Sequence, residues 1–187
     1  MGIYTKALNE GALLMSKDAK IIKNKIKEIC KNNEIDKSFL SKMSSANTFD
    51  KEIKSKTINE LKGYFDLFHI GALMKQEITY NGATSCNYYC KCIGIKNNII
   101  MKFKLYFQSF RSYPEIISEV GNCNELIIPK DVIEQAFKFI RDSVDLEITK
   151  NKIYVSSNGS LGKLRDYAEK KYPDKIAKSK GDYIKFK

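Results

Sequence analysis

Apolar residues in the first third of the chain recur every three or four positions, the spacing of a helix with one buried face. The clearest pattern starts after Ser16, a residue type suited to an N-cap, and stops at Asn32 and Asn33. Its apolar positions are Ala19, Ile22, Ile26, Ile29 and Cys30. Lysines occupy another face, so the pattern predicts an amphipathic helix.

Three further helical patterns follow before residue 70. Asp36 is placed to cap a short second helix, and residues 47–56 form a third pattern. Thr57 and Glu60 make a capping-box pair that opens a fourth helix, which we expect to reach residue 69. The apolar positions of this fourth helix are Ile58, Leu61, Phe65 and Phe68.

Beyond residue 75 apolar residues alternate with polar ones, which is typical of β-strands. The turn signals Asn81-Gly82 and Asn97-Asn98 separate the first of these strands. The expected strands are residues 77–80, 88–96, 99–107, 126–128, 144–149, 152–156 and 183–186. Helices are expected at 129–143 and 159–172, and residues 110–124 are expected to form a loop with a short helix at 114–120.

These patterns predict an α+β protein, in which an N-terminal helical bundle precedes a mixed part with two β-hairpins and packed helices. We place the boundary after residue 72, which gives a helical domain at 1–72 and an α+β domain at 73–187. We expect no signal peptide and no membrane partner, because no apolar run approaches the roughly 20 residues of a membrane helix. An odd number of cysteines, five, favours a reducing compartment, so we expect a cytoplasmic protein.

The chain carries a formal net charge of +11 and is rich in lysine. A strongly basic balance favours a polyanionic partner, because lysines that bind phosphates release counterions. Arginines, which read guanine edges with paired donors, are few, so we expect contacts with the phosphate backbone of nucleic acid. Lys, Asn and Ile are all abundant, as an AT-rich genome would encode, so part of the charge needs no functional explanation.

Part of the helical region resembles the Cro/repressor-type helix-turn-helix family. The resemblance rests on an apolar pair in a first helix, a polar turn, a capping residue and a buried leucine. The matching residues are Ile26, Ile29, Ile35, Asp36 and Leu40. The chain departs from the family at Ser41, Met43 and Ser44, and the resemblance covers residues 19–69 only.

The resemblance implies that residues 47–56 are a recognition helix and that a core helix follows at 57–69. It implies DNA contact by residues in which Asn and Thr suit base edges and Lys suits phosphates. These residues are Asn47, Thr48, Lys51, Lys54 and Lys56. The alternative is a helical subdomain that packs on the rest of the chain.

Two other surfaces combine lysines with aromatic residues, as surfaces that hold single-stranded nucleic acid do. One is a strand face with Lys102, Lys104 and Tyr106. The other is the segment 163–187, with nine basic residues against four acidic ones. Phosphate contacts in this segment are expected from Lys163, Arg165, Lys170 and Lys171. Either surface can equally be a solvated face whose aromatic rings point inward.

Residue types that bind metals occur in two groups. Four cysteines are candidates for a zinc site, but they lack the paired C-x-x-C spacing of zinc ribbons. These are Cys86, Cys90, Cys92 and Cys123. A second group resembles a metal-dependent nuclease centre, although alternation with apolar residues places its acids in solvent. Its members are Asp142, Asp145, Glu147 and Lys150.

The single histidine, His69, is expected at the end of the fourth helix in a structural role. We therefore predict no catalytic residue, no metal and no cofactor. The leading interpretation is a non-enzymatic DNA-binding protein, a regulator or a mobile-element protein, with a protein partner or a homo-oligomer as a further option. The alternatives are an interaction module, such as a phage or plasmid-encoded inhibitor of a host protein, and a metal-dependent nuclease.

Overall fold

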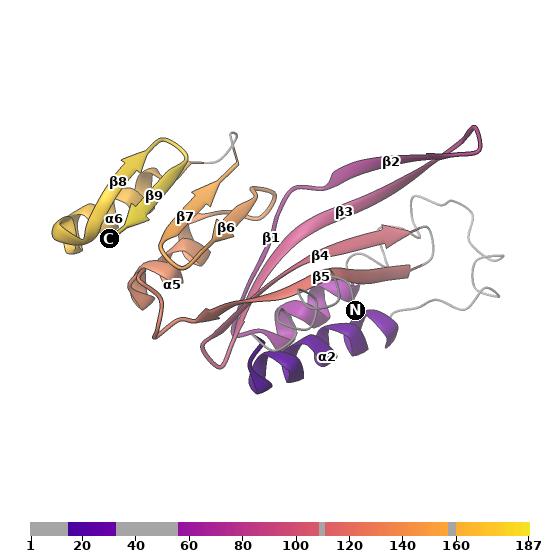
Figure 1. Ribbon diagram of the computed structural model, residues 1–187, viewed down its shortest axis with the longest axis horizontal. Helices are drawn as coiled ribbons and strands as arrows, with labels where there is room; N and C mark the ends of the chain where they lie inside the picture. Colours follow the sequence, from indigo (N-terminus) through magenta and orange to yellow (C-terminus); the bar gives the residue numbers. More distant parts are fainter. Residues whose placement is uncertain (1–14, 33–55, 109–110, 157–159) are drawn as a thin grey trace, which may run out of the picture.

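The computed structural model describes residues 15–32, 56–108, 111–156 and 160–187, and Figure 1 shows their arrangement. These residues form helices and two antiparallel sheets, which confirms the predicted α+β class. No helix in these ranges is long and apolar enough to cross a membrane.

The first sheet has five antiparallel strands. Four follow the order β1-β3-β4-β5, and β2 shares one edge of β3 with β1, so that β2 pairs with residues 83–89 of β3 and β1 with residues 92–95. The strands are β1 (Leu67–Ile70), β2 (Met74–Tyr80), β3 (Ala83–Lys96), β4 (Ile99–Gln108) and β5 (Arg111–Asn122). Two-residue turns join β2 to β3 and β3 to β4, as predicted. Asn81, Gly82, Asn97 and Asn98 all have positive φ, between 49° and 77°, which suits type I′ turns.

The second sheet has four strands in the order β6-β7-β9-β8. They are β6 (Leu146–Ile148), β7 (Lys152–Val155), β8 (Ile176–Lys180) and β9 (Tyr183–Phe186). Helices α5 (Lys130–Phe139) and α6 (Gly162–Lys171) share its hydrophobic core, and a short 3-10 helix, η1 (Pro173–Lys175), follows α6. The predicted hairpin through Lys150 and Asn151 is therefore confirmed.

Helix α2 (Lys17–Asn32) packs on one face of the first sheet (Figure 1). Its predicted N-cap is confirmed, because the Ala19 N–H donates to Ser16 Oγ at 3.1 Å. Ser16 also donates from its N–H and its hydroxyl to the two carboxylate oxygens of Glu119 on β5, at 2.8 and 3.0 Å. The start of α2 is thereby bonded directly to the sheet that it covers.

The first sheet separates two hydrophobic cores. On one face lie α2 and a helix at residues 56–64, which contributes buried Leu61. At one end of the opposite face, Ile93, Ile95 and Ile100 join the core of α5, α6 and the second sheet. The rest of that opposite face carries polar and aromatic side chains and is not covered by the described residues.

The predicted fourth helix ends too late in the chain. Residues 56–64 are helical, and Leu67–Ile70 is strand β1, paired with β3. Thr57 is buried and its hydroxyl lies 2.6 Å from Ser112 Oγ, so it is not a capping residue. Leu61, Phe65 and Phe68 occupy one core, but the chain between them changes from helix to strand because the edge of β3 accepts a partner.

Residues 110–124 were expected to form a loop with a short helix, and this prediction is wrong. Strand β5 occupies most of that segment. Its pairing with β4 shifts register at two places, and Ile116 has a φ of 54°, so apolar and polar residues do not alternate along it. Residues 126–128 form bends rather than the expected strand, and β8, which carries two exposed lysines, was not predicted.

Helices α5 and α6 are shorter than expected. Helix α5 ends at Phe139 rather than near residue 143, and α6 begins at Gly162 rather than at 159. The predicted boundary after residue 72 falls between β1 and β2, two strands that pair with the same β3. The helices at 17–32 and 56–64 and the strands that follow therefore share one core.

Replacing Gly94 with alanine should destabilise the protein. A Cβ at this position would lie 2.5 Å from ring carbons of Phe65, and that ring packs against both Phe68 and Phe103, which also contact each other. Gly94→Ala should lower the free energy of unfolding by about 1–3 kcal/mol, measured by urea denaturation. Gly63→Ala is the control, because its Cβ meets nothing within 4 Å in an exposed helical position. Equal losses in both variants would contradict the packing described for Phe65.

Candidate nucleic-acid interface

Three tyrosines stand side by side on the uncovered part of the first sheet. Tyr89 on β3 pairs with Tyr106 on β4, which pairs in turn with Tyr113 on β5. Their rings are stacked, with centroids 5.2 and 5.4 Å apart and interplanar angles of 28° and 12°. We call these three residues the tyrosine ladder.

The tyrosine ladder offers a ligand mainly ring edges and hydroxyl groups. Tyr106 is buried between its two neighbours, so neither face of its ring is available for stacking. Burial, and then the carboxylate of Glu115, raise the pKa of the Tyr106 phenol. The hydroxyl is protonated at neutral pH, as that of any ordinary tyrosine is, and it hydrogen-bonds to the Glu115 carboxylate.

Three lysines, which we call the lysine cluster, lie beside the ladder on the same face. They are Lys91 on β3 and Lys102 and Lys104 on β4. Lys91 and Lys104 are direct cross-strand partners, and Lys104 Nζ lies 5.2 Å from the Tyr89 ring centroid. Like charges directly opposite each other destabilise a sheet, and acidic partners offset part of this cost, because Lys104 also pairs with Glu115 on β5 and Lys91 contacts Glu147. An anionic ligand on this face would offset the rest.

A pocket of about 270 Å³ opens between the lysine cluster and strand β6. Ile116 on β5 and Glu147 and Thr149 at β6 also line it. Lys91 Nζ lies 3.4 Å from Glu147 Oε1, and this ion pair joins the two sheets at the rim of the pocket. The volume is slightly below the roughly 300–1,000 Å³ of small-molecule sites. A pocket of this size suits a single monomer of a polymeric ligand.

The face of the second sheet that turns away from its core repeats the combination of lysine and tyrosine. Lys152, Lys185 and Lys178 are successive cross-strand partners on β7, β9 and β8. Beside them Tyr154 pairs with Tyr183, and Lys152 Nζ lies 4.6 Å from the Tyr183 ring centroid. Three lysines in one row again cost stability unless an anion is present.

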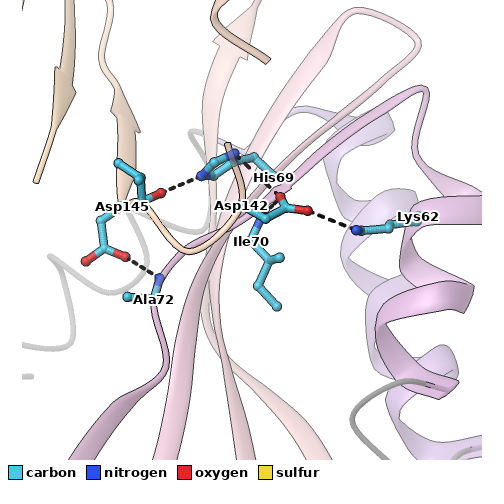
Figure 2. Close-up of polar contacts among 7 residues, drawn as sticks. Lys62, His69, Ile70, Ala72, Asp142 and Asp145 are labelled. Atoms are coloured by element: carbon cyan, nitrogen blue, oxygen red, sulfur yellow. Dashed lines mark hydrogen bonds and ion pairs between the residues drawn. The ribbon is translucent and has the colours of Figure 1, made fainter. Parts of the chain in front are cut away.

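A polar junction fixes the orientation of the two sheets (Figure 2). Buried His69 on β1 donates from Nε2 to the Val144 carbonyl oxygen at 2.6 Å, because a carbonyl can only accept. The same turn before β6 donates in return, from the Ser143 N–H to the Ile70 carbonyl at 3.0 Å. His69 thus has the expected structural role, but it lies in a strand and not at a helix end.

Two of the three acidic residues in the nuclease-like group, Asp142 and Asp145, serve this junction. Asp142 Oδ2 lies 3.0 Å from Lys62 Nζ, and Asp145 Oδ1 accepts the Ala72 N–H at 3.1 Å (Figure 2). Gly71 allows this approach, because a Cβ there would lie 2.1 Å from Asp145 Oδ1. Within the described ranges no three His, Cys, Asp or Glu side chains gather as a metal site would require.

The four cysteines considered for zinc do not meet. Cys90 and Cys92 are buried in the core beneath α2, whereas Cys123 belongs to the core of the second sheet. Cys86 is exposed on β3. Burial raises the pKa of Cys92, which keeps its thiol protonated and makes it a poor metal ligand.

Of the residues expected to contact DNA through a helix-turn-helix, four lie outside the described residues. They are Asn47, Thr48, Lys51 and Lys54. Lys56 is exposed in the helix at 56–64, and Ile26 and Ile29 of the family match are buried on α2 against the sheet. The recognition helix at 47–56 stays a prediction.

Two of the four residues expected to contact phosphate are engaged within the protein. Arg165 donates from Nε to Ser179 Oγ at 2.7 Å and from its guanidinium to the Lys180 carbonyl. Lys171 lies 2.7 Å from the carboxylate of Asp131 on α5. Lys163 and Lys170 are exposed.

Asp131 is the centre of a bonded group that joins α5 to α6. It accepts hydrogen bonds from Tyr167 and Tyr172 at 2.6 and 2.7 Å, besides its ion pair with Lys171. Burial alone would raise the pKa of Asp131, but these three partners outweigh it and hold the pKa at about 2. Tyr167 and Tyr172, two aromatic residues of the basic segment 163–187, therefore bond to α5 and hold the fold together.

The sequence interpretation named Lys102, Lys104 and Tyr106 but missed the residues opposite them. Tyr89 and Lys91 follow from the Asn97-Asn98 turn, because a two-residue turn fixes every cross-strand pair of its hairpin. Tyr113 could not be found in this way, since β5 was not recognised as a strand. Comparison of the chain with protein-family models, with curated proteins and with solved structures gives no match.

Asp131→Asn should lower the free energy of unfolding and should make that free energy depend less on pH in the acid range. The pKa of this carboxylate is about 2 when folded and 3.8 ordinarily, so its contribution is complete above about pH 5 and is lost as pH falls from about 4 to about 2. The variant should lose about 1–2 kcal/mol at pH 7 and unfold less steeply with acid, measured by urea denaturation at several pH values. Asp166→Asn, exposed on α6, is the control. An acid dependence as steep as in the wild type would refute the role of Asp131.

Proposed function

We propose that this protein binds single-stranded nucleic acid, without catalysis, along the open faces of its two sheets. The observation that carries the proposal is the direct opposition of lysines across neighbouring strands. Lys91 faces Lys104 on the first sheet, and Lys152, Lys185 and Lys178 form a row on the second. Such arrangements destabilise the protein on its own, and phosphates that lie between the charges would relieve the repulsion.

The residue types suit a phosphate backbone better than base edges. Lysine attracts phosphate as a point charge, and tyrosine hydroxyls are common donors to phosphate oxygens. The lysine cluster and the tyrosine ladder supply both groups on one face. Recognition is therefore expected to depend little on sequence and strongly on salt.

The shape of the surface favours a single strand over a duplex. A single strand can place one unit in the pocket of about 270 Å³ while its neighbours follow the lysines. A duplex offers no separate unit of that size. The Lys91–Glu147 ion pair at the rim opens when a phosphate competes for Lys91, because both side chains are 40% or more exposed and such exposed pairs contribute roughly 0–1 kcal/mol.

The helix-turn-helix resemblance supports a second site for the same class of ligand. It would place duplex DNA on residues 47–56. Mutations can distinguish the two sites, because residues 47–56 and the lysine cluster are distant in sequence. Each site has its own lysines, whose charges can be reversed separately.

Reversing charge in the lysine cluster should abolish most of the binding. Lys102→Glu with Lys104→Glu should weaken affinity for a labelled 20-nucleotide single strand at least about tenfold, since hydrogen bonds to charged groups contribute roughly 1.5–3 kcal/mol each. The slope of log K against log salt should become shallower by about 1.4, the value for two lost phosphate contacts on a single strand. Fluorescence anisotropy measures both quantities, with single-stranded DNA, single-stranded RNA and duplex DNA as separate ligands.

Two double variants with the same change of charge are the controls. Lys20→Glu with Lys27→Glu alters the exposed side of α2 and should reduce affinity less than threefold. Lys51→Glu with Lys54→Glu tests the helix-turn-helix site. Loss of binding only in this last variant would move the site to residues 47–56, and equal loss in all three would mean attraction by net charge alone.

A further inference from the structure

Strand β2 and the adjoining half of β3 form an arm that extends away from the second sheet (Figure 1). The arm carries most of the large apolar side chains that are exposed in the described part of the chain. Of the nine large apolar side chains that are exposed among the described residues, five lie between residues 73 and 88. They are Leu73, Met74, Ile78, Tyr80 and Tyr88. Apolar groups gathered in this way mark an interaction surface.

The outer edge of β2 is available for pairing. Within the described part of the chain, β2 pairs only with β3. Tyr80 and Ala83 flank the two-residue turn and so form a hydrogen-bonded pair, which fixes the alternation along β2. Lys75, Glu77 and Thr79 consequently direct their N–H and C=O groups away from β3, toward the open edge.

We propose that β2 pairs with β2 of a second copy of this chain, antiparallel and centred on Gln76. In this register Lys75 of each copy lies opposite Glu77 of the other. The ion pair that these two residues form within one strand, at 3.3 Å, would be exchanged for two ion pairs between the copies. Met74 lies opposite Ile78 on the other side of the strand pair, where both are now exposed. Cross-strand pairs of these kinds are the ones that stabilise sheets.

The neighbouring registers are unfavourable. Pairing about Lys75 sets two lysines opposite each other, and pairing about Glu77 sets two glutamates opposite each other. A register shifted by a single residue would match the outward N–H and C=O groups of one strand with the inward ones of the other, so no ladder would form. Only the register centred on Gln76 satisfies both the charges and the hydrogen bonds.

The dimer has a consequence for the ligand surface, although it does not depend on that function. Antiparallel edge pairing about a two-fold axis keeps equivalent faces on the same side. Met74 is the cross-strand partner of Tyr89, so the tyrosine ladders of both copies would lie on one face of a continuous sheet. A nucleic-acid strand could then contact both copies.

Charge reversal at the arm tests the register. Lys75→Glu sets glutamate opposite Glu77 at both ends and should weaken dimerisation about tenfold or more in sedimentation velocity. Lys75→Glu combined with Glu77→Lys restores opposite charges and should return the dimer dissociation constant to within about threefold of the wild type. Far-UV circular dichroism checks that both variants fold. A wild type that stays monomeric up to about millimolar concentration, or a dimer unaffected by Lys75→Glu, would overturn the proposal.

A disulfide across the axis tests the centre of pairing. Gln76 would face Gln76 of the second copy at a non-hydrogen-bonded position, where Cα atoms are about 4.5 Å apart, within disulfide range. Gln76→Cys, in a Cys86→Ser background that removes the exposed thiol of the arm, should therefore crosslink rapidly on mild oxidation. Thr79→Cys in the same background is the control, because its two copies would lie about 20 Å apart. Equal crosslinking at both positions would contradict this register.

Discussion

Buried His69 bonds the two sheets to each other through the carbonyl of Val144. The turn at residues 142–145 also bonds the N–H and C=O groups of Ile70 and the N–H of Ala72. An imidazole and several backbone groups removed from water need such partners, since an unpaired buried group costs roughly 1–3 kcal/mol. The junction therefore determines where the second sheet lies. The second sheet covers one end of the face opposite α2, and the described residues leave the rest of that face uncovered.

This partial cover explains the distribution of side chains on the first sheet. Where α5 and the second sheet pack, the face carries Ile93, Ile95 and Ile100. Beyond that end, where none of the described helices packs, the same strands carry the tyrosine ladder and the lysine cluster. The helix side is apolar along its length, with Met101, Phe103, Leu105 and Phe107 all buried. A single sheet thus has one face in a hydrophobic core and, on half of the other face, the polar surface that we propose binds a ligand.

Local patterns predicted the parts of the fold that local interactions determine. The helix at 17–32 follows from its apolar stripe and from Ser16, and the β2–β3 and β3–β4 hairpins follow from asparagine turns. Strand β1 could not be predicted, because Leu67–Ile70 continues a helical spacing and becomes a strand only beside β3. Strand β5 was hidden by its irregular register, and β8 by its exposed lysines.

The site was predictable to the same extent. Alternation on β4 placed Lys102, Lys104 and Tyr106 on one face, and the turn register supplies Tyr89 and Lys91. The row of lysines on the second sheet could not be predicted without the strand order β7-β9-β8. In this order the last strand, β9, lies between two strands that precede it in the sequence. Basic composition alone could not show that Arg165 and Lys171 bond within the protein, where their charges hold α6 to its neighbours.

The most direct test of the account is photocrosslinking of a bound single strand followed by peptide mass spectrometry. The central claim is that the ligand follows the open faces of both sheets. It predicts crosslinks in the peptides that contain Tyr89, Tyr106 and Tyr113 and in those that contain Tyr154 and Tyr183. Crosslinks confined to α2 or to residues 47–56, with none on the sheet faces, would contradict it.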